Sequence, residues 1–253
     1  MSSDLEAASR HRYRLEANGP TVPGVTTVIG ETTPIRALPW SASEIGARTA
    51  LDYFEDRHKF ANDEDFIHWC RGQFDREWKA KAQRGTRVHD VAERWSRGET
   101  VDVTMEDSGF VDALENFHKD KKPVWIMAER VVVNHKGFGG KFDAIGSWDG
   151  LTVLVDWKSG GHYAYSVALQ AAAYMDSELA VFDENGVLTR TEPLPPLDGA
   201  RIIYLKEDGT YEIVDPFEHV SQDEAMIAFE SCLELYEISQ KINKKLKQGE
   251  RND

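Results

Sequence analysis

The residues best suited to chemistry are two aspartates and a lysine in the middle of the chain. Asp143 lies in the segment GGKFDAIGSW, and Asp156 and Lys158 end the apolar run LTVLVDWK. Two carboxylates in apolar surroundings persist when one is protonated or when a positive charge lies between them. A hard divalent cation with oxygen ligands supplies that charge. Lys158 points to the same face of its strand as Asp156, where its ammonium group could stabilise a phosphate or orient an attacking water.

A tight turn between these segments is expected to bring the aspartates together. Asp149-Gly150 is a favoured pair for a two-residue type I′ hairpin turn. Such a turn pairs Trp148 with Leu151. The same register places Asp143 opposite Asp156, on one face of adjacent antiparallel strands.

The register has one unfavourable consequence, because it also places Lys141 opposite Lys158. We therefore expect the strands to twist or fray beyond Asp143. The alternative is a surface hairpin with scattered charges, which leaves an aspartate at the end of an L-V-L-V run poorly explained.

Composition limits the function classes. The 253 residues include 30 Lys and Arg and 44 Asp and Glu, giving a formal charge of −14 at pH 7. This charge argues against broad, nonspecific binding of polyanions, although a local groove can be basic and a bound cation adds positive charge. No apolar run approaches the roughly 20 residues that span a bilayer, and the first residues lack a secretory signal. Cys70 and Cys232 are expected to be free thiols, which predicts a cytoplasmic protein without an iron–sulfur cluster.

The N-terminal third is predicted to contain short strands and then helices. Residues 13–34 alternate β-branched residues with Gly and Pro, which indicates strands and turns. The first helix is expected to begin with Ser41 as its N-cap and Glu44 as its capping-box partner. Four helices are predicted in all, over 41–57, 63–83, 85–99 and 105–122. The second carries an aromatic stripe that is expected to face a core, formed by Phe66, Trp69, Phe74 and Trp78.

From residue 124 the pattern changes and predicts the core of the fold. The expected order is strands 124–134, 139–148 and 151–159, a helix 166–182, strands 200–206 and 210–215, and a helix from about 221 to 247. This order predicts an α/β fold with a central mixed β-sheet flanked by helices. We expect one domain over 1–253, comprising an N-terminal strand and helical cap (1–84), a catalytic core (85–215) and a C-terminal helix (221–248).

The ordered motifs resemble the PD-(D/E)XK nuclease superfamily, in particular its branch of RecB-like and phage-type exonucleases. GGKFDAIG, a short hairpin, VLVDWKSG and a helix with Gln170 and Tyr174 follow that family's order. The branch places a histidine in a helix before the three strands, and His89 in GTRVHDVAERWSRGE matches it. GVTTVIGETTPIRALPW also resembles the opening of actinobacterial and phage members. The resemblance spans roughly residues 24 to 205 and implies a restriction-endonuclease-like αβββαβ core, in a bacterial or phage-infected cell.

The resemblance also implies a ligand set. His89, Asp143 and Asp156, with the backbone carbonyl of Trp157, would hold one or two Mg²⁺ or Mn²⁺ ions. Lys158 would contact the scissile phosphate or the attacking water.

Three further residues have two interpretations each. By the resemblance, Gln170 supports the lysine or touches the DNA backbone with Tyr174 nearby; the alternative is a packing hydrogen bond in an alanine-rich helix. Glu129 would bind a second metal or a metal-bound water, or would pair with Arg130 or Lys141. Glu93, four residues after His89, would orient the imidazole or be solvated.

Candidate DNA contacts lie on both sides of the histidine. The loop Ser159-Gly160-Gly161-His162-Tyr163 could lie against a DNA strand, with Tyr163 or Tyr165 stacking on a base.

GFGG at 137–140 is not a phosphate loop, because the GK[ST] ending is absent. The densest basic stretch offers phosphate contacts or a solvated helix face, and consists of Arg71, Arg76, Lys79, Lys81, Arg84 and Arg87.

The sequence therefore predicts a metal-dependent deoxyribonuclease. We expect an exonuclease acting on DNA ends or single strands in recombination, repair or phage DNA metabolism. One alternative is a CRISPR-adaptation-like nuclease without an iron–sulfur cluster, against which the missing cysteine quartet counts. Another is an inactive DNA-binding or assembly module of the same fold, which should have lost a ligand or the lysine.

Overall fold

The computed structural model of the chain describes residues 4–33, 37–99, 107–159 and 164–249. Packing divides the chain into two compact units. One combines Met1–Thr33 with Val88–Asp253, and the other is Pro34–Arg87. Every residue expected to ligate a metal belongs to the first unit. Within the described ranges, no helix combines the length and apolarity needed to cross a bilayer.

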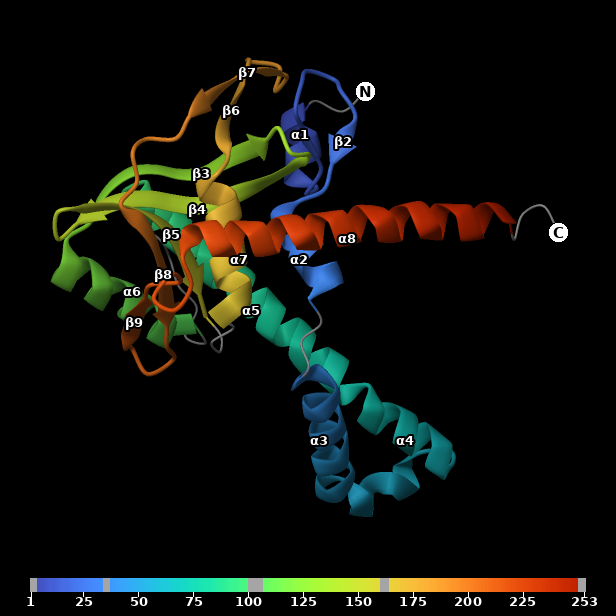
Figure 1. Cartoon of the computed structure of the whole chain (residues 1–253). Helices are drawn as coiled ribbons and strands as arrows, with labels where there is room; N and C mark the ends of the chain where they lie inside the picture. The colour runs from blue at the N-terminus through green and yellow to red at the C-terminus, as the bar shows by residue number, and fades with distance from the viewer. Residues whose placement is uncertain (1–3, 34–36, 100–106, 160–163, 250–253) are drawn as a thin grey trace. The chain divides into compact units, whose positions relative to one another are not determined.

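A seven-stranded mixed sheet forms the centre of the first unit (Figure 1). Its strand order is β7-β6-β3-β4-β5-β8-β9, and only the β5–β8 pair is parallel. The bounds are β3 Val124–Asn134, β4 Phe138–Trp148, β5 Leu151–Lys158, β6 Glu178–Phe182, β7 Leu188–Pro193, β8 Gly199–Leu205 and β9 Tyr211–Val214. The predicted α/β class with a central mixed sheet and flanking helices is confirmed.

Helices cover both faces of this sheet. On one face, α2 (Val25–Thr32), α7 (Ala164–Met175) and α8 (Gln222–Gly249) form the larger apolar core. On the other, α6 (Ser108–Lys121) and the C-terminal part of α5 (Gln73–Ser96) pack around Phe117 and Trp157. A smaller cluster joins α1 (Asp4–Ser9) and the ribbon of β1 (Tyr13–Arg14) and β2 (Thr21–Val22) to the sheet.

The β4–β5 hairpin has the predicted turn and register. Asp149 and Gly150 have φ of 52° and 80°, the left-handed values that a type I′ turn requires. Trp148 pairs with Leu151, and the ladder continues to Ala144 opposite Val155. The regular ladder ends there, one residue before the two aspartates, so the expected fraying begins one step earlier.

Glu129 interrupts the β3–β4 ladder. Ala128 pairs with Ala144 and Arg130 with Phe142, but the pair between them is missing and Glu129 has a φ of 52°. A left-handed residue inside a strand costs roughly 1–2 kcal/mol and reverses the alternation of side chains. In a regular strand, odd- and even-numbered side chains lie on opposite faces of the sheet. Because of the reversal at Glu129, Met127 and Val132 lie on the same face and pack into the same core cluster.

The prediction of strands throughout residues 13–34 is wrong for its second half. Only β1 and β2 are extended, and Val25–Thr32 is helix α2. Val25, Val28 and Ile29 recur at helical spacing and are buried together, so tertiary packing overrides the β-branched composition.

The boundaries of the next helices also differ from prediction. Helix α3 is Ala37–Asp52, so Ser41 lies inside it and Glu44 pairs with Arg48 at 2.8 Å, not in a capping box. A 3-10 helix, η1 (Phe54–Lys59), and then α4 (Asp63–Arg71) follow. The predicted helix 63–83 is interrupted at Gly72, where α4 ends. Helix α5 then continues without interruption across residue 84, where one predicted helix was expected to end and the next to begin. Trp78 is 43% exposed and does not belong to a core-facing stripe.

The predicted helix 166–182 is too long. Helix α7 ends at Met175, and residues 178–182 form β6, which pairs with β3 through Val132 and Leu179. Strand β7 was not predicted; it begins before the Pro-rich loop and pairs with β6. Pairing with an open edge of the sheet determines the extended conformation of these residues, and the local sequence does not reveal that pairing.

Candidate active site

Strands β4 and β5 and helices α5 and α7 bring most of the predicted residues together. The six that converge are His89, Asp143, Asp156, Lys158, Gln170 and Tyr174. All lie in the unit that contains the sheet. The predicted motif order thus corresponds to a cluster in space.

Asp143 is held between the histidine and the backbone of β5. Its Oδ2 accepts a hydrogen bond from the N–H of Trp157 at 2.8 Å and lies 3.3 Å from His89 Nδ1. Burial raises the pKa of Asp143, but the charges of His89 and Lys158 and the Trp157 N–H outweigh it, so the pKa lies below its usual value. The balance of these effects favours the ionised form of Asp143.

Asp156 is the more confined carboxylate, with 7% of its surface exposed. Its Oδ2 lies 2.6 Å from Lys158 Nζ, and its Oδ1 accepts a hydrogen bond from Gln170 Nε2 at 3.2 Å. Burial and the charge of Asp143 raise the pKa of Asp156 in spite of Lys158. Two neighbouring carboxyls whose pKa values move in opposite directions behave as a coupled pair.

Two basic side chains contact these carboxylates. Burial lowers the pKa of Lys158, but Asp156 and Asp143 raise it above its usual value. Burial likewise lowers the pKa of His89, and Asp143 and Asp156 more than offset this. Both basic side chains thus lie against the carboxylates, Lys158 at Asp156 and His89 at Asp143.

Gln170 and Tyr174 lie one helical turn apart on α7 and face the site. Gln170 Nε2 also lies 3.3 Å from Tyr174 Oη, and burial strongly raises the pKa of the Tyr174 phenol. A Cβ at Gly140 would overlap the Tyr174 ring. The GFGG segment thus contributes close backbone packing, and Gly140 is the residue that admits the tyrosine.

Glu129 contacts Lys141, one of its two predicted partners. Burial raises the pKa of Glu129, Lys141 lowers it, and Asp143 and Glu93 raise it, with a net upward shift. The carboxylate is therefore within electrostatic reach of Asp143, and the alternative role as a metal ligand stays a prediction.

Tyr13 was not identified from the sequence. It is buried, and burial together with the charge of Glu129 raises its pKa to about 12. A Cβ at Gly139 would lie 2.5 Å from the Cβ of Tyr13, on the face opposite Tyr174. The adjacent glycines of β4 were the available signal, because they mark close approach of other chain segments.

Other candidates lie apart from this cluster or outside the described residues. Glu93 pairs with Arg97. Residues 160–163, including Tyr163, are outside the described ranges, and Tyr165 is exposed on α7. The basic stretch from Arg71 to Arg87 belongs to the Pro34–Arg87 unit.

The donor set suits a hard divalent cation. The two carboxylates match the preference of Mg²⁺ and Mn²⁺ for oxygen ligands, whereas an imidazole is a more usual ligand of zinc, copper or iron. The N–H and C=O of one extended residue point to the same neighbouring strand, so the Trp157 carbonyl is expected on the Asp143 side. Across the described ranges, no three His, Cys, Asp or Glu side chains form a closed ligand group. Lys158 and His89 lie against the carboxylate oxygens that a cation would contact.

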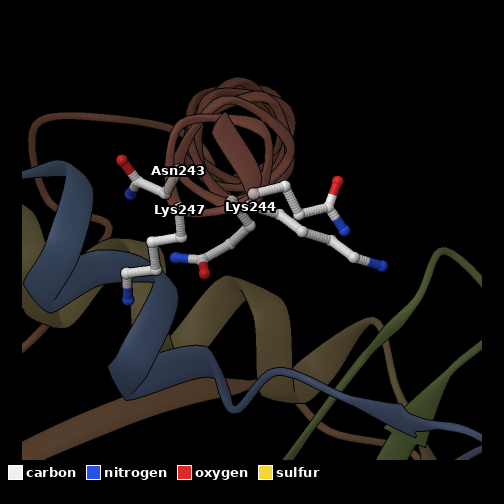
Figure 2. Close-up of a pocket in the computed structure, with 5 residues that line it drawn as sticks. Asn243, Lys244 and Lys247 are labelled. Atoms are coloured by element: carbon white, nitrogen blue, oxygen red, sulfur yellow. The ribbon is translucent and has the colours of Figure 1, made fainter. Parts of the chain in front are cut away.

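A hollow elsewhere on the first unit does not involve these residues. It is lined by one helix, α8, through Gln240, Asn243, Lys244, Lys247 and Gln248 (Figure 2). None of these five lining residues is acidic, so the hollow offers no carboxylate ligand for a metal.

No protein-family model matches the chain, and no curated protein matches its sequence.

Proposed function

We propose that this chain is a divalent-metal-dependent deoxyribonuclease of the PD-(D/E)XK type, acting as an exonuclease in recombination, repair or phage DNA metabolism. One observation carries the proposal. Asp143 and Asp156, from adjacent strands, share a buried site with Lys158, and their pKa values move in opposite directions. Such a pair is costly to bury unless it holds positive charge.

His89, Asp143 and Asp156, with the Trp157 carbonyl, would hold Mg²⁺ or Mn²⁺. When bound, the ion supplies Lewis acidity toward a phosphate oxygen. In the metal-free chain Lys158 and His89 both lie against the carboxylates, and a bound divalent cation would supply positive charge there when His89 is neutral.

The remaining side chains position these groups. The N–H of Trp157 fixes the Asp143 carboxylate, and the Gln170 amide fixes that of Asp156. Lys158 is the one ammonium on this face of β5, so it is suited to stabilise charge on a phosphate or to orient a water. Tyr174 is buried beside Gln170, one helical turn away on α7.

DNA is the proposed substrate although the whole chain is acidic. Between residues 71 and 87, six basic side chains stand against two acidic ones. A local excess of this kind supports phosphate contacts without a basic protein overall.

The test uses the purified full chain on end-labelled linear single-stranded, linear duplex and closed circular DNA. We expect cleavage of a linear form with Mg²⁺ or Mn²⁺, none with EDTA, and resistance of the circle. Asp156→Asn and Lys158→Met should each reduce cleavage by at least about 100-fold. Asp223→Asn and Lys119→Met change exposed residues of α8 and α6 and serve as controls. The proposal fails if no DNA form is cleaved with either metal and Lys158→Met equals the wild type.

A further inference from the structure

Helix α8 has two apolar faces. One packs into the core and buries Ala225, Met226, Phe229 and Leu233. The other is exposed to solvent by 45–64% and consists of Ile227, Leu235, Ile238, Ile242 and Leu246. At 100° per residue, these five lie on the side of the helix opposite Phe229 and Leu233.

The exposed stripe continues where the core contact ends. Figure 1 shows α8 crossing α7 and α2 and continuing beyond them. From Gln240 onward the side that faced the core is polar: Gln240 Nε2 donates to Glu31 Oε2 at 3.0 Å, and Asn243, Lys244 and Lys247 line the hollow in Figure 2. In this half of α8 the apolar side is the outward one, which is the pattern of a helix that packs on a partner.

The spacing of the stripe is symmetric. With Ser231 included, its members follow one another at intervals of four, four, three, four and four residues. This sequence of intervals reads the same in both directions. Two antiparallel copies therefore match position by position, with Ile227 against Leu246 and Leu235 against Ile238 of the second copy. Such self-complementarity is what a two-fold interface requires.

The charges select the same orientation. Asp223, Glu224, Glu230, Glu234 and Glu237 lie in the first part of α8, and Lys241, Lys244, Lys245 and Lys247 in the last. Antiparallel packing places Glu234 near Lys241 of a second copy along one edge of the stripe. Parallel packing would place like charges together.

We propose that α8 pairs with α8 of a second copy of this chain as an antiparallel, two-fold symmetric helix pair. The stripe from Ile227 to Leu246 is about 30 Å long at 1.5 Å per residue, enough for continuous packing of five large side chains from each copy. The pairing is independent of the proposed nuclease activity, since none of the site residues lies on α8.

The first test measures the mass of the full chain by analytical ultracentrifugation over a dilution series. The wild type should be a dimer at high concentration and dissociate on dilution. Ile238→Glu brings two carboxylates together near the two-fold axis and should weaken dimerisation by at least about 100-fold. Ile67→Glu changes an isoleucine of α4 with similar exposure and should leave the dimer unchanged. Circular dichroism checks that each variant is folded.

The second test addresses orientation. Glu234→Lys and Lys241→Glu should each weaken the dimer by about 10-fold, and the double variant should recover it, because the opposite charges meet again. A parallel pair would show no recovery, and that result would overturn the proposed arrangement.

A chain that is monomeric at every concentration also overturns the proposal. This holds if another part of the same chain covers the stripe, and it holds if the stripe binds lipid vesicles. A dimer that tolerates Ile238→Glu has the same consequence. Loss of DNA cleavage with the dimer intact would count against the nuclease and leave the helix pair standing.

Discussion

The Oδ2 of Asp143 lies 2.8 Å from the backbone nitrogen of Trp157, the residue between Asp156 and Lys158. One aspartate is thereby fixed to the strand that carries the other aspartate and the lysine. The relative position of the two carboxylates depends on this hydrogen bond, because the regular ladder of β4 and β5 ends at Ala144 and Val155.

Asp143→Asn should remove the negative charge of this side chain while keeping its position. The amide oxygen can still accept the Trp157 N–H, so the hairpin geometry is expected to persist, but the charge that attracts a cation is lost. We expect Mg²⁺ affinity to fall at least about 10-fold and DNA cleavage at least about 100-fold. Calorimetric Mg²⁺ titration measures the first effect directly. Unchanged Mg²⁺ binding would remove Asp143 from the ligand set.

Lys158→Met should destabilise the metal-free protein in a pH-dependent way. Loss of the ammonium leaves Asp156 buried without its ion-pair partner, which costs roughly 3 kcal/mol when the carboxyl is ionised. The pKa of Asp156 is already raised, so protonation at lower pH should relieve much of this cost. Urea unfolding near pH 8 and near pH 5 tests the difference, with Lys119→Met as the exposed-lysine control. An equal loss at both pH values would mean that the ion pair is not its source.

His89 should make the metal-free protein less stable as the pH rises. Burial lowers its pKa, but Asp143 and Asp156 raise it above the ordinary 6.5. A group with a raised folded-state pKa contributes stability that is complete below the unfolded value and is lost as the pH passes the folded value. The unfolding temperature should therefore fall as the pH rises above the ordinary 6.5, and His89→Gln should flatten this slope.

Mg²⁺ should bind more tightly over that same pH range, since a histidine ligates a metal only as neutral imidazole. Thermal shift measurements with and without Mg²⁺ compare the two trends. Parallel curves for wild type and His89→Gln would exclude the histidine from both roles.

Local sequence patterns predicted the hairpin of the site, the family resemblance supplied His89, Gln170 and Tyr174, and two other long-range features were missed. The Asp149-Gly150 turn and the two-residue periodicity of β5 are local signals, and they gave the register that brings Asp143 toward Asp156. Tyr13 and the reversal at Glu129 follow from packing between segments that are far apart in the chain. The adjacent glycines of β4 indicate that another segment lies close, but no local pattern identifies which distant residue that is.

The same reason explains the errors in the fold. Residues 178–182 continue an apolar helical pattern, yet they pair with the open edge of β3. Val25–Thr32 has strand-like composition, yet its buried face is helical. In both places burial against the sheet outweighs local propensity.

Gly140→Ala should destabilise the protein, because the added methyl overlaps the Tyr174 ring. Overpacking of this kind costs about 1–3 kcal/mol and should also shift Gln170, which lies beside that tyrosine. Gly30→Ala is the matched control: this glycine lies inside α2 and nothing would lie within 4 Å of the new Cβ. It should be neutral or stabilising by up to about 1 kcal/mol. Equal effects of the two changes would mean that the tyrosine can move freely.

Glu129→Gly should be more stable than Glu129→Ala by about 1 kcal/mol, since only glycine adopts a φ of 52° without strain. Both variants lack the carboxylate. A loss of Mg²⁺ binding that is the same in both variants is therefore due to the missing carboxylate and not to the backbone. Chemical unfolding and Mg²⁺ titration of the pair distinguish backbone from side chain. A Glu129→Ala variant as stable as Glu129→Gly would show that the left-handed backbone carries no strain.

The hairpin that joins β4 to β5 also sets an order of assembly. Asp143 and Trp157 are 14 residues apart, whereas the contact of Thr152 with Asp198 beside the parallel β5–β8 pair closes 46 residues. Short loops close first, so we expect the carboxylates to meet before β8 docks and before His89 reaches them from α5. Lys158 belongs to the same hairpin. The nascent chain therefore brings its own counter-charge to the carboxylates, and the pair can form during folding before any ion is bound.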